Sequence, residues 1–60
     1  MTPTRADTIQ AGDLVLMNRC GVAVFCQVDY VVVAEGIHFL HTDQVVQMYQ
    51  PTDLLAVVRP

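Results

Sequence analysis

The sequence contains no lysine, and its three arginines, Arg5, Arg19 and Arg59, are widely separated along the chain. Proteins that bind nucleic acid through its phosphates need clustered Lys or Arg, so direct nucleic-acid binding is not expected. The six acidic residues are also scattered singly, and the net charge is −3. The chain therefore lacks the dense acidic stripe that imitation of nucleic acid would require.

Long apolar runs are missing as well. No run approaches the ~20 residues of a membrane-spanning helix, so no integral membrane segment is predicted. Residues 1–8 contain no apolar stretch of the kind that export signals carry, and cysteine occurs only as Cys20 and Cys26. In an extended chain these two residues would lie roughly 20 Å apart, too far for a disulfide. We therefore predict a cytoplasmic protein with free thiols.

The usual signatures of catalysis and of metal or cofactor binding are also absent from the sequence. The three glycines stand alone at positions 12, 21 and 36, which excludes a glycine-rich phosphate loop. His38 and His41 are three residues apart, and on a strand that spacing directs them to opposite faces. Neither cysteine belongs to a catalytic motif. The sequence thus predicts no catalytic residues, no metal and no cofactor, and it favours a protein that is not an enzyme.

Hydrophobic residues, by contrast, are abundant, at 53% of a chain of 60 residues. A domain of this size buries only roughly 60% of the surface that its unfolded chain exposes, so its stability is marginal. It cannot hide so many apolar side chains in its own core. We therefore expect a homo-oligomer or a complex with a protein partner.

Alternation of apolar and polar residues with period two predicts β-strands. It is clearest between residues 22 and 30, where Phe25 lies on the more polar register. Gly21 is the natural positive-φ residue of the preceding turn, and Glu35–Gly36 predicts a hairpin. The other expected strands are Leu14–Met17, Val31–Val33, Ile37–His41, Gln44–Tyr49 and Leu54–Val58.

These elements predict an all-β fold, a small SH3-like barrel of five or six short antiparallel strands. No amphipathic helical segment is long enough to pack against a sheet. The predicted barrel occupies residues 9–60 and follows a flexible N-terminal arm of residues 1–8, which is polar and contains Pro3. The alternative is a small open sheet that a partner chain completes.

The strand Val46-Gln47-Met48-Tyr49 resembles the Val-Gln-Ile-Tyr strand of the plasmid-encoded type II dihydrofolate reductases. Gly12-Asp13-Leu14-Val15 is similar to the Gly-Asp-Arg-Val opening of that family, and the resemblance extends over about Ile9 to Val58. It implies an SH3-like barrel that assembles as a tetramer around one active-site pore. It also implies that Gln47 and Tyr49 would contact folate and nicotinamide, with Val46 and Met48 as their packing neighbours.

The sequence leaves three functional hypotheses. The leading one is a non-enzymatic SH3-like module for protein interaction or self-association, for example an accessory protein of a phage or plasmid. Its expected contact residues are Phe25, Val46, Gln47, Met48 and Tyr49. The first alternative is an oligomeric reductase of the type II kind, although an acidic chain would repel the anionic substrates. The second is an acidic inhibitor of a nucleic-acid-binding protein.

Overall fold

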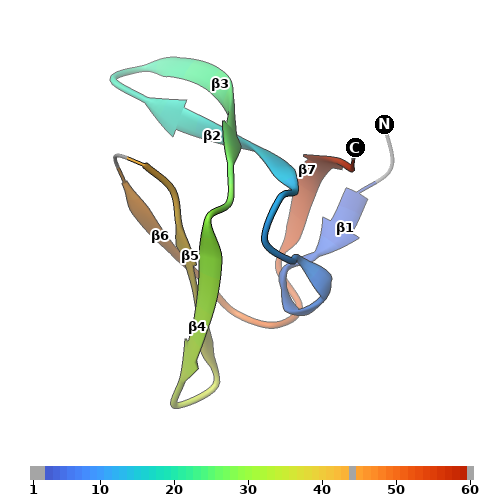
Figure 1. The fold of residues 1–60 in the computed structure, drawn as a ribbon. Helices are drawn as coiled ribbons and strands as arrows, with labels where there is room; N and C mark the ends of the chain where they lie inside the picture. The colour runs from blue at the N-terminus through green and yellow to red at the C-terminus, as the bar shows by residue number, and fades with distance from the viewer. Residues whose placement is uncertain (1–2, 44, 60) are drawn as a thin grey trace.

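The computed structural model describes residues 3–43 and 45–59, which form seven short strands and one 3₁₀ turn (Figure 1). All pairings are antiparallel, so the all-β prediction is confirmed, with seven strands rather than five or six. The elements are β1 (Pro3–Arg5), η1 (Ala6–Thr8), β2 (Leu14–Arg19), β3 (Val22–Gln27), β4 (Tyr30–Ala34), β5 (Ile37–His41), β6 (Val46–Tyr49) and β7 (Leu54–Val58).

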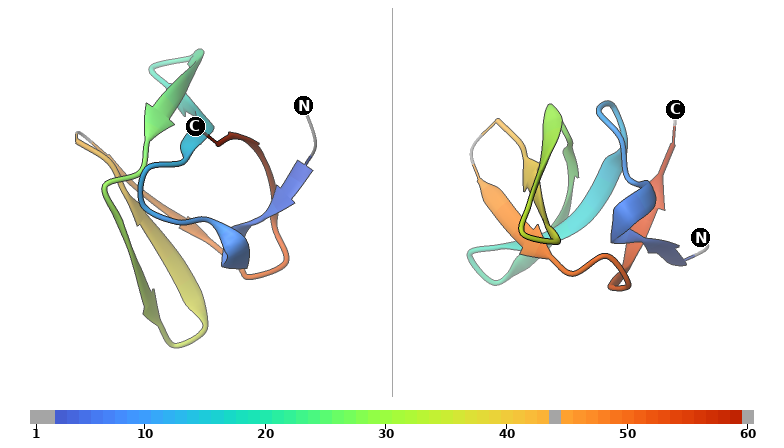
Figure 2. Two further views of the ribbon diagram at one scale, coloured as in Figure 1. Left: turned by 45° about the vertical axis from the view of Figure 1, so that its right-hand side comes forward. Right: turned by 90° about the horizontal axis from the view of Figure 1, so that it is seen from below.

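The strands form two sheets. The first has the order β1-β7-β2-β3, and the second has the order β4-β5-β6. Figure 2 shows β4–β6 on one side of the molecule and β1 and β7 on the other. No strand pairing connects the two sheets within the described residues, so a closed barrel is not found there. The long alternating segment predicted from residue 22 is divided at residues 28–29, where the chain passes from β3 in one sheet to β4 in the other.

Residues 3–8, which the sequence predicts as part of a flexible arm, form the strand β1 and the 3₁₀ turn η1, and residues 1–2 lie outside the described residues. Pro3–Arg5 pairs with β7, and Ala6, which is fully buried, donates its backbone N–H to the carbonyl oxygen of Asp53 at 2.8 Å. A three-residue strand is too short to show a periodic pattern. Its partners also lie about 50 positions away in the sequence, so no local signal announces the pairing.

In two hairpins, the turn consists of a residue in the left-handed backbone conformation followed by glycine. Cys20 and Gly21 have φ angles of 54° and 81°, and Glu35 and Gly36 have φ angles of 52° and 77°. Positive φ at both central residues is the geometry of a type I′ turn, whose twist matches that of the flanking strands. The predicted positive φ at Gly21 and the predicted hairpin at Glu35–Gly36 are both confirmed.

Glu35 is an unfavourable residue for its turn, because a left-handed conformation crowds its Cβ. Asparagine tolerates this conformation better and is preferred before glycine in type I′ turns. We expect Glu35→Asn to raise the free energy of unfolding by about 0.5 kcal/mol, measured by urea denaturation. Glu35→Ala is the control and should bring no such gain. Equal effects of the two variants would contradict this account of the turn.

The core lies between the two sheets and is small. Val15 and Leu40, one from each sheet, are completely buried, and Val28 in the crossing segment is 1% exposed. The full cluster of buried apolar residues is Ile9, Val15, Met17, Cys26, Val28, Leu40 and Val57. Each sheet therefore turns one face inward, toward this cluster, and the other face outward.

The turns before β2 and β7 share one hydrogen-bond pattern, Gln-x-x-Asp. The Gln10 N–H donates to Oδ2 of Asp13 at 2.9 Å, and the Asp13 N–H donates to the Gln10 carbonyl at 3.1 Å. Gln50 and Asp53 make the same two bonds, at 2.9 and 3.1 Å. Only Asp13 is buried, and it also accepts a hydrogen bond from Nε of Arg59 at 3.3 Å. This contact ties the start of β2 to the end of β7.

Candidate interaction surface

The outward-facing side of the second sheet is predominantly apolar. The pairings Tyr30–His41 and His41–Val46 place these residues on one face, and strand alternation adds every second residue of β4, β5 and β6. We call this surface the outer face. Its members are Tyr30, Val32, Ala34, Ile37, Phe39, His41, Val46 and Met48. None of these eight residues is Asp, Glu, Lys or Arg, so within these three described strands the outer face has no permanent charge.

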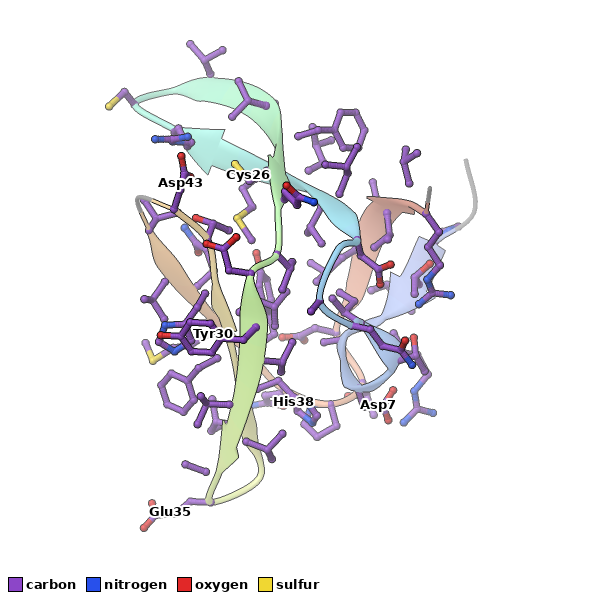
Figure 3. The ribbon with its side chains drawn as sticks, in the orientation of Figure 1. Asp7, Cys26, Tyr30, Glu35, His38 and Asp43 are labelled. Atoms are coloured by element: carbon purple, nitrogen blue, oxygen red, sulfur yellow. The ribbon has the colours of Figure 1, made fainter. Side chains whose placement is uncertain are left out.

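Several large side chains of the outer face are open to solvent. The exposed fractions are 53% for Tyr30, 50% for Val46 and 67% for Met48. Figure 3 shows Tyr30 projecting from β4 on the side away from β7, whereas His38 projects toward β1 and β7. Complete burial of a side chain such as Val or Met stabilises a protein or complex by about 1.5–3 kcal/mol. A partner that covered this face would therefore gain a large hydrophobic contribution to its binding free energy.

Tyr30 and His41 organise one end of the outer face. Their rings stack with centroids 4.3 Å apart and planes 15° from parallel. The stack forms because the two residues are direct cross-strand partners in β4 and β5. The ring of Tyr30 is therefore held in place before any partner binds, which reduces the entropy lost on association.

Strand alternation divides the contact residues predicted in β6. Val46 and Met48 belong to the outer face, but Gln47 and Tyr49 lie on the opposite, core-facing side. Tyr49 packs against the core, and burial raises the pKa of its phenol above the ordinary value, with smaller contributions from Asp53 and Cys26. The phenol is therefore neutral at physiological pH. On a single strand these two pairs cannot contact one flat partner surface together.

Phe25 lies on the first sheet, away from the outer face. It pairs with Leu16 on the outward side of β2 and β3, and its side chain is 43% exposed. Beside it is a hollow of about 260 Å³ lined by Arg19, Phe25, Cys26, Gln27, Asp29 and Asp43. Within it, Nη1 of Arg19 lies 4.0 Å from Sγ of Cys26. The predicted contact residues are thus spread over three surfaces of the molecule.

Sequence reasoning missed six of the eight residues of the outer face, among them Tyr30, Val32, Phe39 and His41. A signal was available in the Glu35–Gly36 hairpin. A two-residue turn fixes the register of its strands, and that register places Val32 opposite Phe39 and Tyr30 opposite His41. Extending the pairing to β6 would then have joined these four residues to Val46 and Met48.

The described residues include no group of three or more His, Cys, Asp or Glu side chains that could hold a metal ion. Both cysteines are free thiols, with Cys20 exposed and Cys26 buried. Across residues 3–43 and 45–59, no helix has the length and apolar character needed to cross a membrane.

The fold and this surface define a small antiparallel all-β protein with an apolar sheet face open to solvent. In comparisons with known protein families, curated proteins and solved structures, the chain has no match.

Proposed function

We propose that this protein is a non-enzymatic protein-interaction module that self-associates through the outer face. The observation that carries the proposal is the continuous set of eight uncharged residues on three neighbouring strands. Contiguous exposed apolar surface on a small protein marks an interaction site. Two sheet faces of this kind can pack against each other at about 10 Å separation, with the side chains interdigitating.

A second copy of the chain fits this face better than a foreign protein does. Among the described residues, ten large hydrophobic side chains are exposed, whereas the buried core cluster has seven members. A domain with so small a core gains stability when a partner binds its folded state. A second copy of the same chain is present wherever the protein is made, so it can always serve as that partner. A two-fold arrangement places the same face on both subunits, so no complementary charge is required.

We further propose that the fold is of the SH3-like type, with β1 as an addition to it. Three features support this. The consecutive strands β3 and β4 lie in different sheets, so together they resemble one long strand that bends and takes part in both sheets. The last strand, β7, pairs with β2 in the first sheet. The four-residue turn of residues 50–53 joins β6 to β7 and carries the chain from the second sheet back to the first.

Light scattering over a concentration series tests self-association directly. We expect a mass above that of the monomer at high concentration. Met48→Glu should raise the dissociation constant by more than about 100-fold, because it places a carboxylate in the apolar contact of both subunits. Met48 is the most exposed large hydrophobic residue of the outer face, so the substitution leaves the core intact.

Leu54→Glu is the matched control, since Leu54 is 64% exposed, against 67% for Met48, but lies on β7 of the other sheet. This variant should associate like the wild type. Circular dichroism of both variants checks that the fold is retained. A wild-type protein that stays monomeric at every concentration would refute self-association, and equal weakening by the two substitutions would place the interface elsewhere.

A further inference from the structure

The outer face contains one imidazole, that of His41. Its strand neighbours on this face are Tyr30 from β4, stacked on its ring, and Val46 from β6. The side chain is half-buried already, so contact with a second sheet face would remove its remaining access to water. The second histidine of the chain, His38, is on the same strand but on the core-facing side.

Among the described residues, no carboxylate forms an ion pair with this ring. The phenol of Tyr30 is the titratable group facing it from β4, and β6 contributes none. The two ion pairs among the described residues, Arg5–Asp7 and Arg59–Asp13, do not involve His41. Asp29 contacts the residue through backbone atoms, its N–H donating to the His41 carbonyl at 2.7 Å, and Asp43 lies two residues further along the chain.

We infer that protonation of His41 dissociates the assembly formed through the outer face, so that acidification releases the monomer. The inference rests on the proposed self-association. Removing an imidazolium from water costs free energy unless an anion pairs with it, and the facing copy presents the same uncharged residues. Desolvating the neutral imidazole costs much less than desolvating the charged ring, and the neutral ring is already stacked on Tyr30.

The direction of the pH effect follows from proton linkage. The associated state favours the neutral ring. The dissociation constant is therefore independent of pH at high pH, and it increases as the pH falls and the His41 ring of the monomer becomes protonated. Histidine side chains ordinarily titrate near pH 6.5. Between pH 7.5 and 5.5 we therefore expect the dissociation constant to rise by up to about tenfold for each protomer, or about 100-fold for a dimer. Asp and Glu side chains ordinarily titrate below this range.

The two histidines provide a matched pair of variants. Wild type, His41→Gln and His38→Gln are compared by sedimentation equilibrium at pH 7.5 and pH 5.5, with circular dichroism to follow the fold. We expect wild type and His38→Gln to associate at pH 7.5 and to dissociate at pH 5.5. His41→Gln should lose the pH response and remain associated at pH 5.5, because glutamine takes up no proton.

The possible outcomes distinguish the role of His41 from the proposed self-association on which it rests. Association of the wild-type protein to the same extent at both pH values would overturn the role of His41 and leave self-association intact. A pH response that survives in His41→Gln, or disappears in His38→Gln, would also overturn it. A wild-type protein that is monomeric at pH 7.5 would overturn both.

Discussion

Replacing Leu40 with alanine is expected to lower the free energy of unfolding by about 3–5 kcal/mol, enough to unfold a large fraction of so small a domain. Leu40 has no exposed surface, and it contributes to the core from the middle strand of the second sheet. Truncation removes three buried carbon atoms and leaves a cavity. With seven residues in the core cluster, few neighbours are available to close it.

Urea denaturation followed by circular dichroism measures this loss. Val33→Ala is the control on the same side of the sheet, because Val33 is 58% exposed and should change the stability by no more than about 0.5 kcal/mol. If Leu40→Ala is too unstable to purify, Leu40→Val removes one carbon atom and keeps the measurement possible. A loss below about 1 kcal/mol for Leu40→Ala would contradict the position of the core between the sheets.

Asp13→Ala is expected to lower the free energy of unfolding by about 2–3 kcal/mol. Asp13 is 6% exposed, and its carboxylate accepts hydrogen bonds from the Gln10 N–H and from Nε of Arg59. Without it, the backbone N–H of Gln10 in the turn before β2 loses its acceptor. Half of the Arg59 side chain is exposed, so water can solvate the released guanidinium and keep the loss below that of a fully buried ion pair.

Asp53→Ala is the matched control, since Asp53 makes the same two turn hydrogen bonds with Gln50 but is exposed. We expect it to cost about 1 kcal/mol or less. Asp13→Asn should fall between the two, because its amide oxygen can still accept from Gln10. Equal losses for Asp13→Ala and Asp53→Ala in thermal or urea denaturation would show that neither burial nor Arg59 adds to the turn.

The local sequence pattern was sufficient to predict most of the strands. Short apolar runs bounded by turn residues located β2, β5 and β7 to within about two residues, and the Glu35–Gly36 pair identified its hairpin. These features depend on the preferences of neighbouring residues, which a sequence displays directly. Strand β1 had no such signal, because what orders it is hydrogen bonding to residues 54–56.

The candidate surface required the tertiary structure for a different reason. In β4 both registers are apolar, and in β6 the more polar register, Gln47 and Tyr49, is the one that faces the core, so residue type along these strands does not distinguish the core-facing side from the solvent-facing side. Val46 and Gln47 could be assigned to faces only when Leu40, the partner of Gln47, was found buried between the sheets. The sequence by itself determined the all-β class, most of the strands and the excess of hydrophobic residues. Which of those residues remain exposed was decided by the packing of the two sheets against each other, because burial depends on contacts between residues that are distant in the sequence, such as Val15 and Leu40.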